Sequence, residues 1–197
     1  MSRFIRLENP PRFDDHKEYL PFLRRDFRYR CAYCERTEAF LGWEEFFEID
    51  HFRPVWRFGE QAAHYPNLYY SCGKFNRHKG KTWPSDALVA SGFCFADPCQ
   101  EDMYVEYLQE APDGKLQPLT NCGCYTSDHI RLNRRALLDW RQDRQQAAQD
   151  LESLARAASR FEGLLPANLG PVEQRRIREA IKTLKARIVR DGQRFAL

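Results

Sequence analysis

The sequence lacks any apolar run that approaches the roughly 20 residues needed to cross a bilayer, so we expect no membrane-spanning helix. Its N-terminus, MSRFIRLENPPRFDD, lacks the apolar segment and the cleavage site of a secretory signal, which predicts a cytoplasmic protein. Internal repeats and low-complexity tracts are also missing. With 43% hydrophobic and 14% aromatic residues, the 197-residue chain is expected to fold as one domain with a core, or as a small domain with an appendage.

The net charge is small, +3, but it is unevenly distributed. Residues 131–197 hold 15 of the 31 Lys and Arg residues and only 8 of the 28 Asp and Glu residues. A basic C-terminal third fits a phosphate-bearing partner, and it also fits a pair of solvated, Arg-rich helices. Charge alone favours the second interpretation.

The cysteines number seven, an odd count, and two of them form Cys31-Ala-Tyr-Cys34. In a reducing cytosol, metal binding or free thiols account for cysteines better than disulfides do. The sequence therefore favours metal binding or free thiols.

The first half of the chain predicts a helical segment followed by two strands and a short helix. Residues 16–28 have helical character that Pro21 interrupts. FFEIDHFRPV has the aromatic and β-branched character of a strand that stops at Pro54, and LYYSC is a second strand. GKFNRHKGK then predicts one or two helical turns ended by Gly80.

The second half predicts short strands and then a helical hairpin. Frequent Pro and Gly residues in 84–125 indicate strands and turns, with a hairpin at Pro112-Asp113-Gly114. From about residue 128 the apolar spacing is helical, and GLLPANLGPVEQ separates two helices. The second helix carries an apolar stripe of Ile177, Ile181, Leu184 and Ile188. We expect an α+β fold, with a core in residues 1–127 and a basic helical hairpin, residues 128–197, packed on it.

Asp50 and His51 are adjacent near the end of the first predicted strand. Hydrolysis of a phosphodiester needs an oxygen-ligated divalent cation and a nearby base, which an Asp and a neutral His can supply. Asn76 can offer an amide oxygen as a second ligand, and Asn67 can hold the loop by hydrogen bonds. Taken singly, each residue has an ordinary structural explanation, such as a turn, a packed imidazole or a solvated helix face.

The joint spacing of these residues resembles the HNH endonuclease superfamily, the nucleases with a ββα-metal fold. That family has roughly Cys-x-x-Cys, then Asp-His with a nearby Pro, then Asn, then Cys-x-x-Cys-Asn-x-x-Lys. This chain has, in order, Cys31-Ala-Tyr-Cys34, Asp50-His51-Phe-Arg-Pro54, Asn67 and Cys72-Gly-Lys-Phe75-Asn76-Arg-His-Lys79. The resemblance covers residues 31–80, about a quarter of the chain.

The resemblance implies a metal-dependent nuclease that usually acts on DNA. It implies that His51 is the general base, that Asp50 and Asn76 hold the catalytic metal, and that Asn67 orients the active-site loop. The oxygen ligands of Asp50 and Asn76 suit Mg²⁺ or Mn²⁺. His78 is a second candidate for the last motif position. Asn76 is favoured, because it directly follows the Cys-like position. The expected phosphate contacts are Arg53, Arg77 and Lys79.

Phe75 departs from the family pattern, because it stands where zinc-bearing members have a fourth cysteine. Cys31, Cys34 and Cys72 can still bind structural zinc if another residue completes the four ligands. The candidates for this ligand are His78, Cys94, Cys99, Cys122 and Cys124. Alternatively, Phe75 replaces the metal with apolar packing.

The segment from FADPCQED to SDHIRLNRRALLDWR looks like the tail of a bacterial HNH subgroup. Relatives of that subgroup include nucleases of Septu-type anti-phage systems, sometimes beside an ATPase partner, so a defence role is implied. Two other functions stay open: a non-catalytic zinc-knuckle module that binds nucleic acid, and a helical hairpin that docks a protein partner through its apolar stripe.

Overall fold

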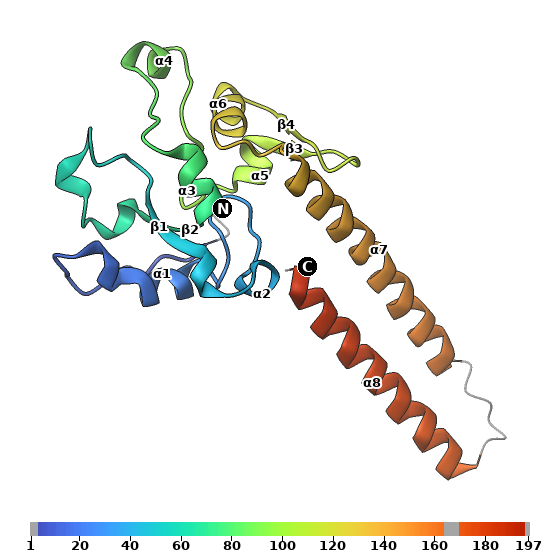
Figure 1. Ribbon diagram of the computed structural model, residues 1–197. Coiled ribbons are helices and arrows are strands. Elements are labelled where there is room, and N and C mark those ends of the chain that lie inside the picture. The colour runs from blue at the N-terminus through green and yellow to red at the C-terminus, as the bar shows by residue number, and fades with distance from the viewer. Residues whose placement is uncertain (1–3, 164–169, 196–197) are drawn as a thin grey trace. The chain divides into compact units, whose positions relative to one another are not determined.

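The chain has a mixed α and β fold, as its sequence predicts, in a computed structural model that describes residues 4–163 and 170–195 (Figure 1). Within these ranges, the side chains of residues 161–163 and 187–195 are not described. The chain divides into two compact units, Met1–Asp139 and Trp140–Leu197. No helix in the described ranges is long and apolar enough to cross a membrane.

The N-terminal helical segment consists of a 3-10 turn, η1 (His16–Tyr19), and helix α1 (Leu20–Asp26). The Asp15 side chain caps η1 by accepting a hydrogen bond from the Lys17 backbone N–H. Pro21 lies in the first turn of α1, where its missing N–H is not needed. Pro21 therefore fits the start of this helix and does not interrupt it.

Two antiparallel strands and a helix follow one another in the middle of the chain. Strand β1 (Phe47–His51) pairs with β2 (Leu68–Cys72), and α3 (Gly73–Lys79) begins directly after β2. Gly80 ends α3 with a φ of +51°, a left-handed value that glycine adopts readily. The predicted strand, loop, strand, short helix order is confirmed here.

Short elements flank this arrangement. Helix α2 (Glu38–Leu41) and the 3-10 turn η2 (Glu44–Phe46) precede β1. Two further 3-10 turns, η3 (Gly59–Gln61) and η4 (Tyr65–Asn67), lie in the loop between the two strands.

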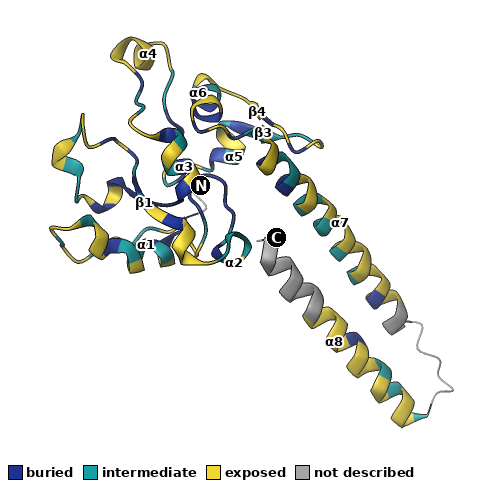
Figure 2. Ribbon diagram, in the orientation of Figure 1, coloured by how far each residue is buried: buried dark blue, intermediate teal, exposed yellow. Residues whose placement is uncertain are grey.

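Aromatic side chains form much of the core of the first unit. The ring of Tyr69 on β2 lies 5.0 Å from that of Phe52 and 5.6 Å from that of Phe27 on the N-terminal segment. Phe75 of α3 lies 6.0 Å from Tyr33, which sits between Cys31 and Cys34. Figure 2 shows the buried residues gathered in this part of the chain. This core fixes the end of β1 relative to α3.

Residues 86–129 contain more helix than their sequence predicts. Besides the hairpin of β3 (Leu108–Glu110) and β4 (Leu116–Pro118), they form α4 (Asp86–Ala90), α5 (Met103–Glu106) and α6 (Asn121–His129). The hairpin at Pro112-Asp113-Gly114 is confirmed, but the first four residues of MYVEYL are helical. The reason is local: Asp102, Ser85 and Thr120 each cap a helix by accepting a backbone N–H.

Two long helices, α7 (Arg135–Gly163) and α8 (Pro171–Phe195), follow. The end of α7 at Gly163 and the start of α8 at Pro171 are as predicted, whereas α7 begins later than the predicted position near residue 128. Along the apolar stripe of α8, Ile181 is buried, Ile177 is half-buried and Leu184 is 37% exposed. The Ile188 side chain lies outside the described residues.

Candidate functional site

His51 is the last residue of β1, and its imidazole has a fixed hydrogen-bond partner. Nε2 lies 2.8 Å from the backbone oxygen of Ala62 in the loop between the strands. Because a carbonyl oxygen only accepts hydrogen bonds, Nε2 carries the hydrogen and Nδ1 has the lone pair. A neutral His51 is therefore prepared to accept a proton at Nδ1.

Asn67 holds the loop that contains Ala62. Its Oδ1 accepts the Arg53 backbone N–H at 2.7 Å, and its Nδ2 donates to the backbone oxygens of Arg53, at 3.0 Å, and of Gln61, at 3.2 Å. The side chain is buried, so these bonds satisfy polar atoms that water does not reach. Asn67 thus joins the start of the loop to the residue next to Ala62.

Asp50 is only 2% exposed, and both of its carboxylate oxygens have partners. Oδ2 accepts from the Tyr33 hydroxyl at 2.5 Å, and Oδ1 accepts from Lys79 Nζ at 3.0 Å. Burial raises the pKa of Asp50 above its usual value, although Lys79 and the hydrogen bond from Tyr33 act in the opposite direction. Tyr33 and Lys79 therefore stabilise the charged form of Asp50.

Lys79 is buried at the end of α3, which corrects its expected role as a phosphate contact. Its ammonium also donates to the backbone oxygen of His51 at 2.5 Å. Lys79 follows the buried Phe75 by four residues, so the two side chains share the inner face of the helix. A group in this position supports Asp50 and His51 from inside the protein.

Asn76 on α3 is held by Glu48 on β1. Its Nδ2 donates to Glu48 Oε2 at 2.9 Å, so its Oδ1 is the atom left for other partners. Glu48 precedes Asp50 by two residues on the same strand, a spacing that puts both side chains on one face. Three oxygen-bearing side chains thus come from β1 and α3.

Asp50, His51 and Asn76 line one open pocket of about 180 Å³. Trp56 and Lys81 are also among its lining residues. His78, the alternative to Asn76, is not. The pocket therefore brings together the residues that the resemblance assigns to the base and to the catalytic metal.

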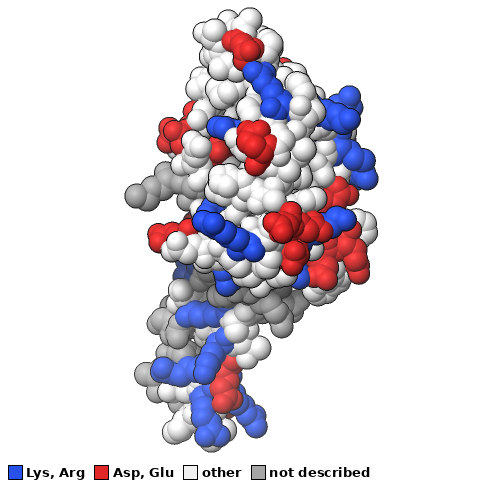
Figure 3. Space-filling view, turned by 90° about the vertical axis from the view of Figure 1, so that its left-hand side faces the viewer, with Lys and Arg blue, Asp and Glu red and all other residues white. Residues whose placement is uncertain are grey.

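Arg53 and Arg77 are exposed, as contacts with an external phosphate require. Arg77 lines a second pocket, of about 220 Å³, together with Arg36 and Lys74. On the face seen in Figure 3, Lys and Arg are interspersed with Asp and Glu and do not form one continuous basic patch.

Cys31, Cys34 and Cys72 are buried, and their sulfur atoms all lie within 4.8 Å of one another. Arg36 Nε donates to Cys34 Sγ at 3.5 Å. Burial would raise the pKa of Cys34, but hydrogen bonds from the other two thiols and the Arg36 guanidinium outweigh it and lower that pKa. Three sulfur atoms this close together can bind a metal ion such as zinc.

Phe75, where the resemblance would place a fourth cysteine, is fully buried. The Arg134 guanidinium lies 4.2 Å from the centre of its ring, a cation–π contact. Among the described residues, no further His, Cys, Asp or Glu joins the three cysteines. Each expected replacement, from His78 to Cys124, is thus outside the group.

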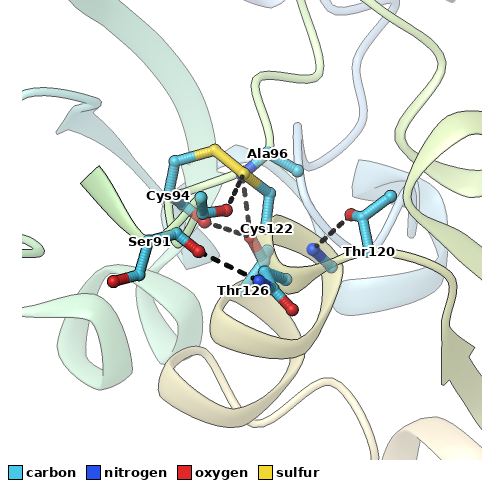
Figure 4. The surroundings of a disulfide bond; sticks show 9 residues. Ser91, Cys94, Ala96, Thr120, Cys122 and Thr126 are labelled. Atoms are coloured by element: carbon cyan, nitrogen blue, oxygen red, sulfur yellow. Dashed lines mark hydrogen bonds between the residues drawn. A yellow bond between two sulfur atoms is a disulfide. The ribbon is translucent and has the colours of Figure 1, made fainter. Parts of the chain in front are cut away.

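Cys94 and Cys122 form a disulfide, which corrects the expectation of free thiols and removes both as zinc ligands (Figure 4). It joins α6 to the segment after α4. Beside it, Thr126 Oγ1 accepts the Ala96 backbone N–H at 2.7 Å. The other five cysteines are free.

Sequence reasoning missed three residues of this site. Tyr33 bonds Asp50, Glu48 bonds Asn76, and the His16 ring lies 4.9 Å from that of His51. The alternation of β1 could have indicated Glu48, whereas nothing in the sequence links Tyr33 or His16 to the site.

The pocket combines a histidine of fixed tautomer, a buried carboxylate and an amide oxygen. Such a set can accept a proton and ligate a hard cation. No protein-family model and no curated protein matches this sequence.

Proposed function

We propose that this protein is a metal-dependent endonuclease of the HNH type, which hydrolyses phosphodiester bonds with DNA as the expected substrate. The observation that carries the proposal is the hydrogen bond between His51 Nε2 and the Ala62 carbonyl, which leaves Nδ1 as a base beside Asp50 and Asn76. A role in anti-phage defence beside an ATPase partner is part of the same proposal, and it follows from the tail resemblance alone.

In this mechanism His51 Nδ1 accepts a proton from the water that attacks phosphorus, the bond from phosphorus to the leaving oxygen breaks, and that oxygen takes a proton from solvent water. Asn67 keeps the Ala62 carbonyl in place, so the imidazole stays in the required tautomer and orientation. Arg53 and Arg77, both exposed, contact phosphates of the substrate. A base of this kind contributes about 10²- to 10⁴-fold to the rate.

The residues of the pocket fit a divalent cation. Each carboxylate oxygen has two lone pairs, so Asp50 keeps acceptor capacity after Tyr33 and Lys79 are bonded. Asn76 contributes Oδ1, and Glu48 lies beside it. This oxygen-rich set suits Mg²⁺ or Mn²⁺, which would neutralise the charge that develops on the phosphate.

We further propose that Cys31, Cys34 and Cys72 hold a zinc ion, whose fourth ligand would come from outside these three residues. Three buried sulfur atoms within 4.8 Å and the nearby Arg36 cation support this assignment. The three-thiolate set carries one more negative charge than zinc neutralises, and Arg36 offsets it.

The test incubates supercoiled plasmid and single-stranded DNA with the protein in Mg²⁺, Mn²⁺ or a chelator. We expect metal-dependent cleavage that His51→Ala lowers by about 10²-fold or more. His64→Ala is the matched control, because His64 is exposed and lies in the same loop. Cleavage that survives His51→Ala unchanged rejects His51 as the base.

The rival function, a non-catalytic zinc module that binds nucleic acid, gives a different result. It predicts DNA binding that depends on Cys72, together with no cleavage in any metal by a folded protein. Under our proposal, His51→Ala retains binding and loses cleavage only.

A further inference from the structure

Trp56 is a large apolar side chain that lies 60% exposed at the pocket of Asp50, His51 and Asn76. Isolated exposed apolar residues are common and carry no meaning by themselves. Trp56 differs from these, because it lines the same pocket as the proposed catalytic residues.

A hydrogen bond fixes the Trp56 ring. Its Nε1–H donates to the backbone oxygen of Lys81 at 2.8 Å, which joins the loop between β1 and β2 to the segment just after α3. The same loop is held three residues earlier, where Asn67 bonds both backbone groups of Arg53. A ring held in this way loses little conformational entropy when a flat partner stacks on it.

The charges near Trp56 suit a phosphate backbone. Arg53 and Lys81 are exposed and basic, and Arg57 is paired with Asp86. Aromatic rings interleaved with cations are typical of surfaces that bind single-stranded nucleic acids, where bases stack on the rings. A duplex offers no such contact, because its neighbouring base pairs cover the base faces.

We infer that Trp56 stacks on an unpaired nucleobase next to the phosphate in the pocket, so that single-stranded nucleic acid, or an unpaired segment, is the preferred substrate. The inference rests on the proposed nuclease function for the identity of the phosphate site. It assigns to Trp56 a specificity role that does not involve the metal or the base.

The experiment measures binding in a chelator, so that no cleavage occurs. Fluorescence anisotropy follows a labelled oligothymidylate of about 12 nucleotides and a duplex of equal length. The variants are Trp56→Ala, Trp56→Phe, which keeps a ring but loses Nε1–H, and the control Trp43→Ala. Trp43 is 68% exposed and is not among the residues that line the pocket.

Trp56→Ala should raise the Kd for the single strand about 5- to 100-fold and leave duplex binding within about twofold. Trp56→Phe should retain most of the affinity, and Trp43→Ala should behave as the wild type. Circular dichroism shows whether each variant is folded. Unchanged single-strand binding by folded Trp56→Ala overturns the inference, and so does an equal loss on the duplex, which would indicate a wedge between base pairs.

The binding and cleavage results separate the two proposals. If Trp56 controls single-strand binding and no metal supports cleavage, the stacking contact holds and the proposed hydrolysis fails. If metal-dependent cleavage is found and Trp56→Ala alters neither binding nor cleavage of single strands, the nuclease holds and the stacking contact is wrong.

Discussion

The ammonium of Lys79 lies 3.0 Å from Asp50 Oδ1, and both side chains are almost completely buried. A buried ion pair contributes little more to the stability of the fold than apolar residues of similar size would. Removing one partner, however, leaves an uncompensated charge in the core. Lys79→Met should therefore lower the free energy of unfolding by about 3–5 kcal/mol, measured by urea denaturation. The exposed Lys81→Met is the control and should change it by less than about 0.5 kcal/mol.

The double variant Asp50→Asn, Lys79→Met tests the reason for this effect. Because neither charge remains, it should be less destabilised than the sum of the two single variants. Additive effects would show that Lys79 acts through packing and not through its charge.

Glu38 predicts a pH dependence of stability. Its carboxylate accepts hydrogen bonds from Arg24 at 2.9 and 2.8 Å and from the Tyr70 hydroxyl at 2.6 Å. Burial alone would raise the pKa of Glu38, but the bonds from Arg24 and Tyr70 outweigh it and lower the pKa below its ordinary value of 4.5. A lowered pKa adds stability that is complete above the ordinary value and is lost as the pH falls through the lowered value.

The measurement compares the wild type with Glu38→Gln at a series of pH values. Their difference in free energy of unfolding should be constant above pH 4.5 and should shrink below it. The exposed Glu45→Gln should differ from the wild type by less than about 0.5 kcal/mol throughout. A difference between wild type and Glu38→Gln that grows on acidification contradicts the prediction.

The disulfide between Cys94 and Cys122 closes a loop across a sequence separation of 28 residues. A loop of this length restricts the unfolded chain enough to add about 3–4 kcal/mol to stability. Cys94→Ser should therefore lower the melting temperature without a reductant, and a reductant should lower that of the wild type to a similar value. Cys124→Ser, which removes a free thiol on α6, is the control. A wild type that does not respond to a reductant contradicts a stabilising disulfide.

The zinc assignment predicts about one zinc ion per purified chain. Cys72→Ser should lose it, because only two thiolates of the group remain, whereas Cys99→Ser should keep it, since Cys99 bonds Arg6 and is outside the group. Elemental analysis measures the zinc. If the wild type holds no more zinc than Cys72→Ser, Phe75 packing replaces the metal.

The sequence predicts the order of the strands, turns and short helices well, because residues within each segment determine them. LYYSC forms β2, Gly80 ends α3, and the Pro-Asp-Gly turn forms the hairpin. The error at Pro21 came from treating a helix-starting proline as an interruption. Short polar caps such as Asp102 explain why predicted strands are helical.

Long-range pairings are harder to predict than local elements. The spacing of the cysteines does not predict the Cys94–Cys122 disulfide, since cysteine connectivity does not follow from sequence. The burial of Lys79 had a weak signal, its four-residue distance from Phe75, but a basic run more often lies on a solvated face. The bonds from Tyr33 to Asp50 and from Glu48 to Asn76 depend on how separate segments meet.

Glu48 gives a prediction about metal affinity that rests on the proposed function. Its Oε2 fixes the Asn76 amide at 2.9 Å and so directs Oδ1 away from itself. Removing a partner that orients a ligand costs about 10- to 100-fold in metal affinity, so Glu48→Ala should weaken Mn²⁺ binding by that factor, measured as free Mn²⁺ by electron paramagnetic resonance. Glu45→Ala removes an equal charge from an exposed residue of η2 and should weaken binding by less than about threefold, because charges near the surface are screened by salt. Equal losses in both variants would mean that Glu48 acts only through its charge, whereas a loss confined to Glu48→Ala supports its role in orienting Asn76.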